Sequence, residues 1–64
     1  MKYPEIEVQL SGNNGNAFSI IGRMINALRN GGVSKVEIEQ FTEEAQSGDY
    51  DHLLQTCMKW VDVT

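Results

Sequence analysis

The chain has 64 residues, nine of them acidic and five basic, and its formal net charge is −4. This charge argues against a nucleic-acid polymer as partner, because proteins that bind one carry a basic stripe, but it leaves room for a small anion. The length predicts one domain, residues 1–64, which buries only about 60 % of the surface of its unfolded chain and therefore gains stability from oligomerisation.

The first predicted element is a strand over residues 5–10, where apolar and polar side chains alternate strictly. Ile6, Val8 and Leu10 then share one face, which is typical of a half-buried strand. Residues 11–16, with the sequence SGNNGN, predict a loop because these residue types accept positive φ or form local hydrogen bonds. Asn16 at the end of this loop is a suitable N-cap for a helix.

The loop leads into a predicted helix from Ala17 to about Asn30. Its apolar stripe consists of Phe18, Ile21, Ile25 and Leu28 and is widened by Ile20, Met24 and Ala27. Gly31 and Gly32 end the helix. Gly22, in its middle, destabilises it by about 1 kcal/mol relative to alanine, which the close approach of another helix, including one from a second subunit, would explain.

A second helix is predicted from its local signals. Ser34 as N-cap and Glu37 three residues later form a capping box, and Val33 with Ile38 forms a hydrophobic staple. Its inner face contains Ile38, Phe41 and Ala45, and the helix ends at Ser47 and Gly48.

Asp49 is the predicted cap of a third helix, whose apolar positions are Tyr50, Leu53, Leu54, Cys57 and Met58. Residues 59–63 alternate again and predict a short closing strand. The expected fold is therefore a small α+β domain of β-α-α-α-β order with a two-stranded sheet. Two strands alone leave exposed edges, so we expect a homo-oligomer whose subunits extend the sheet.

Catalysis has little support in the sequence. The single histidine, His52, does not face Asp51 on a helix, and it lies five positions from Cys57, which is typical of a small buried hydrophobe. The lone cysteine excludes an internal disulfide, and with one histidine it cannot form a four-ligand zinc site. No P-loop is present, and we expect no enzyme activity, cofactor or metal; a phosphodiesterase that uses His52 is the weaker alternative.

A ligand site is predicted at the loop over residues 11–16. Its backbone amides are free to converge beside the positive end of the following helix, where a phosphate would bind. The candidate residues are Ser11, Asn13, Asn14, Gly15, Asn16 and Phe18. A plain turn with an asparagine cap explains the same spacing equally well.

Charged and aromatic residues elsewhere complete this candidate site. Arg23 is the better candidate for contacting a phosphate, because Arg29 near the helix C-terminus can simply oppose the helix dipole. Tyr50 and Asp51 are candidates for stacking on a purine and accepting its hydrogen bonds. The alternative is a tyrosine that packs across the helix end between capping aspartates.

Several short motifs stand out: GNAF at residues 15–18, IIGR at 20–23, ALR at 27–29, GVSK at 32–35, and SGDYDHLL at 47–54 with Trp60 and Val61. These motifs, which cover most of the chain from Gly15 to Val63, resemble a widespread family of very small phage and bacterial proteins. That family is similar to the viral sponges that sequester cyclic oligonucleotide signals of bacterial anti-phage (CBASS) defence. The resemblance implies a homo-oligomer, a tetramer, that binds a cyclic dinucleotide such as 3′3′-cyclic GMP–AMP without cleaving it.

Two further expectations concern location and partners. No apolar run approaches the ~20 residues of a membrane span, and Met1-Lys2-Tyr3-Pro4-Glu5 is not a signal-peptide start. We therefore expect no membrane partner and a place in the cytoplasm of the bacterial host. The alternative function is a small acidic interaction protein that inhibits or regulates a host protein through its acidic face or an open sheet edge.

Overall fold

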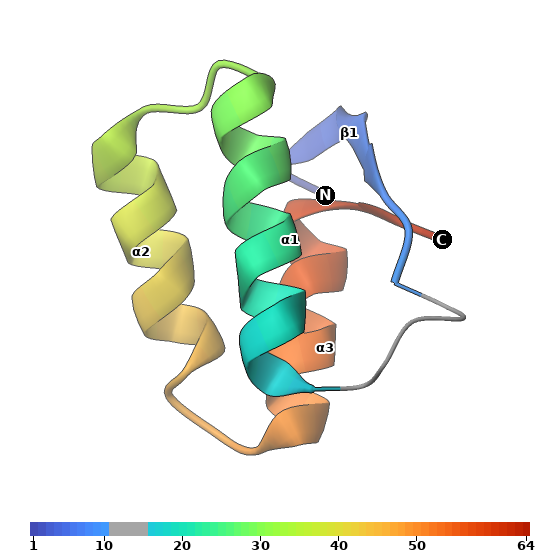
Figure 1. Cartoon of the computed structure of the whole chain (residues 1–64), viewed down its shortest axis with the longest axis vertical. Helices are drawn as coiled ribbons and strands as arrows, with labels where there is room; N and C mark the ends of the chain where they lie inside the picture. Colours follow the sequence, from blue (N-terminus) through green and yellow to red (C-terminus); the bar gives the residue numbers. More distant parts are fainter. Residues whose placement is uncertain (11–15) are drawn as a thin grey trace.

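The computed structural model describes residues 1–10 and 16–64 (Figure 1). It confirms the predicted α+β domain of β-α-α-α-β order. The elements are β1 (Tyr3–Val8), α1 (Ala17–Asn30), α2 (Lys35–Ala45), α3 (Tyr50–Trp60) and β2 (Val61–Val63). Helices α1 and α2 run antiparallel side by side, and β1 packs beside α1 (Figure 1).

The two strands form a parallel sheet. Tyr3 pairs with Val61 and Val8 pairs with Val63, and the register shifts between these two pairs. Parallel strands require a long crossover connection, which the three helices provide. The sheet therefore joins the two ends of the described chain.

The strand boundaries differ from those predicted. β1 lies two residues earlier than expected, so the half-buried Leu10 falls outside it. β2 begins only at Val61, because α3 continues through Trp60 and the Val61 N–H still donates to the carbonyl of Cys57. Helical hydrogen bonding thus overrides the alternating pattern of residues 59–63.

All three helices begin at their predicted caps. The capping side chains belong to Asn16, Ser34 and Asp49. They accept hydrogen bonds from the backbone N–H groups of Phe18, Glu37 and His52 at 2.8, 3.3 and 2.9 Å. Each bond satisfies a donor that would otherwise lack an intrahelical partner.

Helix α1 ends in a Schellman motif. The Val33 N–H donates to the carbonyl of Leu28 at 3.0 Å, and the Gly32 N–H donates to that of Arg29 at 3.1 Å. Gly32 has a φ of +86°, a left-handed conformation that glycine adopts without steric cost. The predicted glycine stop is confirmed.

The core lies between the sheet and the helices, and Phe41, Met24 and Leu28 are fully buried in it. Phe18 is not part of this core, although its spacing placed it on the apolar stripe: its side chain is 84 % exposed. No helix of the described chain approaches Gly22, since a Cβ built there meets nothing within 4 Å. The expected close approach is therefore absent within one subunit.

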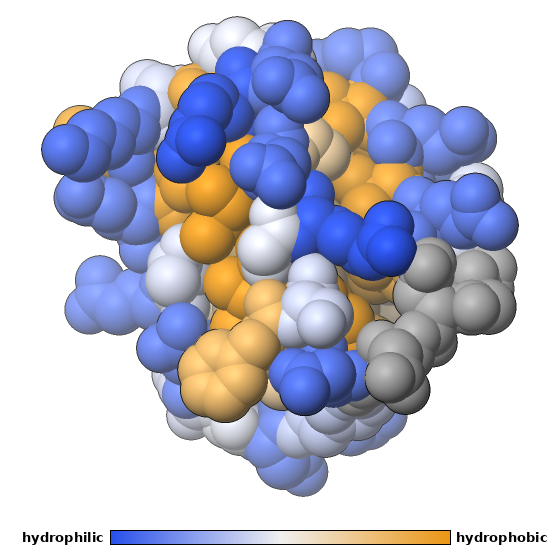
Figure 2. All heavy atoms as spheres, viewed as in Figure 1, coloured by the Kyte–Doolittle hydropathy of each residue, from blue (hydrophilic) through white to orange (hydrophobic). Residues whose placement is uncertain are grey.

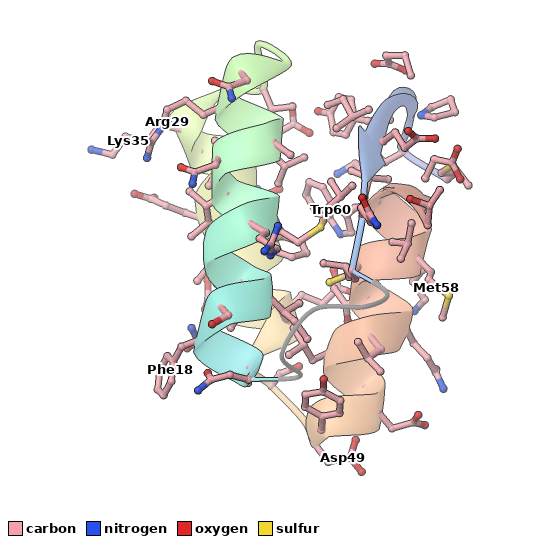
Figure 3. The ribbon with its side chains drawn as sticks, turned by 45° about the vertical axis from the view of Figure 1, so that its right-hand side comes forward. Phe18, Arg29, Lys35, Asp49, Met58 and Trp60 are labelled. Carbon is pink, nitrogen blue, oxygen red and sulfur yellow. The ribbon has the colours of Figure 1, made fainter. Side chains whose placement is uncertain are left out.

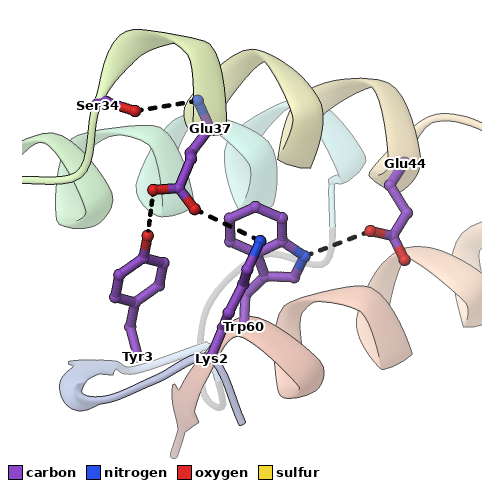
Figure 4. Close-up of polar contacts among 6 residues, drawn as sticks. All are labelled: Lys2, Tyr3, Ser34, Glu37, Glu44 and Trp60. Carbon is purple, nitrogen blue, oxygen red and sulfur yellow. Dashed lines mark hydrogen bonds and ion pairs between the residues drawn. The ribbon is translucent and has the colours of Figure 1, made fainter.

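The predicted capping box is only half formed. Ser34 accepts from the Glu37 N–H, but the Glu37 carboxylate turns away, accepts a 2.7 Å hydrogen bond from the Tyr3 hydroxyl and lies 3.4 Å from Lys2 Nζ (Figure 4). The hydrogen bond from Tyr3 lowers the pKa of Glu37, and the same bond raises the pKa of Tyr3. A tertiary contact has replaced the local one.

Trp60 lies at the centre of the same region, which we call the Trp60 network (Lys2, Tyr3, Glu37, Phe41, Glu44, Trp60). Its indole Nε1–H donates to Glu44 at 3.4 Å, and Lys2 Nζ lies 4.1 Å from the ring centroid (Figure 4). Phe41 meets the indole edge-on, with centroids 5.4 Å apart. The network fastens the N-terminal strand and the end of α3 to α2.

In the described ranges, residues 1–10 and 16–64, no helix combines the length and the apolar character needed to cross a membrane.

Candidate functional site

A largely apolar pocket of about 310 Å³ opens where α1 begins and α2 passes into α3. We call it the aromatic pocket. Its lining residues are Ala17, Phe18, Ile21, Ala45, Gln46, Gly48, Asp49, Tyr50 and Leu53. Two of these, Phe18 and Tyr50, are large aromatic residues that are 84 % and 44 % exposed. The pocket thus has a buried apolar floor and exposed rings among its walls.

Helix caps place both rings at this pocket. Asn16 caps α1 and fixes its start, so Phe18 occupies the first turn of this helix. Asp49 fixes the start of α3, so Tyr50 is the first residue of that helix. The pocket therefore lies between two helix N-termini.

The donors of the first turn of α1 are partly used by the protein itself. Asn16 Oδ1 accepts from the Phe18 N–H at 2.8 Å and the Ser19 N–H at 3.4 Å, and the Asn16 carbonyl accepts from the Ile20 N–H at 3.0 Å. These amides are not open to a phosphate. A cradle of converging amides would have to come from residues 11–15, which lie outside the described residues.

His52, which does not line the aromatic pocket, links the start of α3 to the end of α2. Its Nε2 lies 2.9 Å from the carbonyl of Glu44 and 3.1 Å from Ser47 Oγ. Because a carbonyl oxygen only accepts, Nε2 carries the hydrogen of this bond. Gly48 is required beside the ring, since a Cβ there would lie 2.8 Å from His52 Cγ. His52 thus clamps the turn that carries Asp49.

The structure brings together some of the predicted site residues and separates others. Phe18 and Tyr50, 32 positions apart in the sequence, line one pocket. Asp51 does not line it, and its Oδ2 accepts from Gln55 at 3.2 Å; Asp49 contributes the carboxylate instead. Arg23 is exposed on α1 and lines neither pocket.

The remaining predicted residues are Ser11, Asn13, Asn14 and Gly15, which lie outside the described residues, and Asn16, which acts as a helix cap.

A second pocket, of about 390 Å³, opens between α1 and α2 near the other end of both helices. We call it the basic pocket. Its lining residues are Ile25, Arg29, Val33, Lys35, Ile38, Glu39 and Thr42. Sequence reasoning missed this pocket, because it assigned Arg29 to the helix dipole and gave Lys35 no role. The spacing of Ile25 and Arg29, one helical turn apart, was the available signal.

Cys57 is buried, and burial raises the pKa of its thiol to about 11. A thiol with this pKa is neutral near pH 7 and is a poor nucleophile and metal ligand. Among residues 1–10 and 16–64, no three His, Cys, Asp or Glu side chains gather as metal ligands.

Comparisons with known proteins found no matching family model, no matching curated protein and no matching solved structure.

Proposed function

We propose that the protein binds a purine nucleotide in the aromatic pocket and sequesters it without cleaving it. The observation that carries this proposal is the pair of exposed rings, Phe18 and Tyr50, at one apolar pocket. Exposed aromatic side chains beside a hollow are the usual means of holding a nucleobase, and stacking contributes about 1–3 kcal/mol per base. A purine base needs a flat apolar surface and a few polar partners at its edge.

The polar partners are present on the same wall. Asp49 uses Oδ1 to cap α3, and its Oδ2 receives no hydrogen bond from the described residues. A carboxylate oxygen accepts from the exocyclic amine and ring N–H of guanine. Gln46, the residue that follows α2, also lines the pocket and adds an amide that both donates and accepts. The arrangement therefore favours guanine over pyrimidines.

The resemblance of the sequence motifs to viral sponges narrows the ligand to a cyclic dinucleotide such as 3′3′-cyclic GMP–AMP, held in the cytoplasm of an infected bacterium. Sequestration demands tight capture, and a nanomolar site needs about −12 kcal/mol. A half-open pocket on a 64-residue subunit supplies less than that. A homo-oligomer, a tetramer, would enclose the ligand further, and the outer edges of a two-stranded sheet are where another subunit could add a strand.

Binding without turnover agrees with the state of the two reactive side chains. The Nε2 of His52 is engaged by the Glu44 carbonyl and Ser47, and the Cys57 thiol is buried and neutral. Neither is among the residues that line the aromatic pocket.

The proposal is tested by native mass spectrometry of the purified protein with a mixture of cyclic dinucleotides and mononucleotides. We expect one cyclic dinucleotide to be retained, and heating should release it intact. Phe18→Ala should lose the ligand, while Met58→Ala, which removes an exposed apolar side chain on the other side of the molecule (Figure 3), should keep it. Released hydrolysis products would indicate an enzyme. Retention of no nucleotide would refute the proposal and favour the acidic interaction protein.

A further inference from the structure

One stripe of helix α1 connects the aromatic pocket with the basic pocket. Phe18, Gly22, Ile25 and Arg29 follow one another at intervals of four, three and four residues, which places them on the same face of the helix. Phe18 lines the aromatic pocket, and Ile25 and Arg29 line the basic pocket. The eleven positions from Phe18 to Arg29 span roughly 16 Å along the helix axis.

The two pockets also adjoin across the crease between α1 and α2. On α1, Ile21 lines the aromatic pocket, and Ile25, one turn later, lines the basic pocket. On α2, Ala45 lines the aromatic pocket and Thr42, about one turn earlier, lines the basic pocket. Apolar surface is visible along this crease in Figure 2. In Figure 3 the side chains of Phe18, Arg29 and Lys35 project from the same side of the molecule.

Gly22 keeps the stripe open at its middle. The space above it is empty to at least 4 Å, and glycine destabilises a helix relative to alanine. No packing within the described chain accounts for it. Glycine at an exposed helix position lets another molecule approach the backbone closely.

The two ends of the crease differ in charge. The aromatic pocket contains a carboxylate, Asp49, and no cation among its lining residues. The basic pocket carries Arg29 and Lys35, and neither cation forms an ion pair with a described residue. Glu39 lies on the same rim, which leaves one net positive charge there. Side chains of a helix lean toward its N-terminus, so Arg29 leans back toward the aromatic end.

We infer that the two pockets are a single ligand groove, in which Phe18 and Tyr50 hold a base and Arg29 and Lys35, rather than Arg23, hold the phosphates of the same molecule. This inference rests on the proposed function and adds the orientation of the ligand. Its aromatic ring lies at the Phe18 end of the groove, and its anionic groups lie toward Arg29 and Lys35. The occupant is a small aromatic anion, because both cations are available and the groove ends in aromatic rings.

The charge arm of the test measures the affinity for 3′3′-cyclic GMP–AMP by calorimetry at two salt concentrations. Arg29→Gln and Lys35→Gln should each weaken binding about tenfold and reduce its salt dependence. Lys59→Gln removes the same charge from an exposed site outside both pockets and should change the affinity less than twofold. Arg23→Gln should resemble this control. An equal loss in all of these variants would overturn the assignment.

The steric arm uses Gly22→Leu, which adds a side chain to the stripe between the two pockets, although Gly22 itself lines neither of them. The control is Asn30→Leu, an exposed position at the C-terminal end of α1 that lies off the stripe and outside both pockets. We expect the first to abolish binding and the second to retain it, with helical circular dichroism unchanged in both. If Gly22→Leu instead dissociates the ligand-free oligomer, the stripe is a contact between subunits and the groove proposal is wrong.

The outcomes separate this inference from the proposed function. A wild-type protein that binds no nucleotide refutes both. A wild-type protein that binds, with Arg29→Gln and Lys35→Gln within twofold of it, refutes the shared groove and leaves the aromatic pocket as the whole site.

Discussion

The Trp60 network and the groove use the same kinds of side chain in opposite ways. In the network, Trp60 is 5 % exposed, its indole N–H is bonded to Glu44, and a lysine lies over its ring. In the groove, Phe18 is 84 % exposed, and the two cations, Arg29 and Lys35, line the opposite end without an ion pair among the described residues. Aromatic rings and cations satisfy each other in the first region and remain available in the second.

This difference separates stability from binding. The network joins three elements through contacts that a small domain needs, since 64 residues bury a modest core. The groove has buried core residues at its floor, but its exposed side chains add little to the core and leave a large apolar ring, Phe18, in water. We therefore expect substitutions in the network to change the free energy of unfolding, and substitutions of the exposed groove side chains Phe18, Arg29 and Lys35 to change mainly the ligand affinity.

The largest loss of stability should follow from a large-to-small substitution in the core beside Trp60. Phe41 is fully buried and packs edge-on against the indole, so Phe41→Ala should lower the free energy of unfolding by about 3–5 kcal/mol. Urea denaturation followed by tryptophan fluorescence measures this loss. The matched change Phe18→Ala should leave stability within about 0.5 kcal/mol of wild type. Similar losses in both variants would contradict the division between the two regions.

A smaller loss is expected at the turn that positions Asp49. In Gly48→Ala the new Cβ would meet His52 at 2.8 Å, so the ring must shift and its bond to the Glu44 carbonyl weakens. We expect a destabilisation of about 1–3 kcal/mol, as for other overpacked sites, measured by thermal denaturation. The new Cβ would also lie 2.9 Å from His52 Cβ, so His52→Gly, which removes the whole side chain, should relieve the clash in the same background. An undiminished effect in the double variant would show that the clash is not its cause.

Gly22→Ala should have the opposite sign. The space around Gly22 is open and its backbone is helical, so alanine should stabilise the protein by roughly 0.5–1 kcal/mol. A rise in the unfolding midpoint in urea would demonstrate it. Destabilisation would mean that something packs against Gly22 in the native assembly.

The smallest effect concerns pH. The hydrogen bond from Tyr3 lowers the pKa of Glu37, so this carboxylate stabilises the fold above its unfolded-state pKa, and that contribution is lost as the pH falls through its lower folded-state value. In Glu37→Gln, the free energy of unfolding, measured by urea denaturation at a series of pH values, should fall less steeply as the pH is lowered. Tyr3→Phe should make this fall less steep as well, because the partner is removed. An unchanged pH dependence in both variants would exclude this linkage.

Local signals in the sequence were sufficient for the starts of all three helices and for the end of α1. The caps Asn16, Ser34 and Asp49 act on amides two or three residues away, and the left-handed Gly32 acts within one turn. Such interactions depend on neighbouring residues only, so a sequence pattern can predict them. The burial of Phe41 followed from its helical spacing in the same way.

Contacts between distant segments were not predictable. The Glu37 carboxylate accepts a hydrogen bond from Tyr3, 34 positions away, and not from the backbone N–H of the cap residue Ser34. Nothing in the capping-box pattern indicates this. Phe18 satisfied the helical period yet lies outside the core, because the period does not show where a neighbouring element ends. The pairing of Phe18 with Tyr50 and the basic pocket both depend on how α1, α2 and α3 pack.

The central claim is that the groove, and not the Trp60 network, receives the ligand. Titration of ¹⁵N-labelled protein with 3′3′-cyclic GMP–AMP tests it directly, because Gly22 and the Trp60 indole each give an N–H signal. We predict that the amide signals of Phe18, Gly22 and Arg29 shift with saturation while the Trp60 indole signal stays in place. Shifts centred on the Trp60 indole, or none along α1, would contradict it.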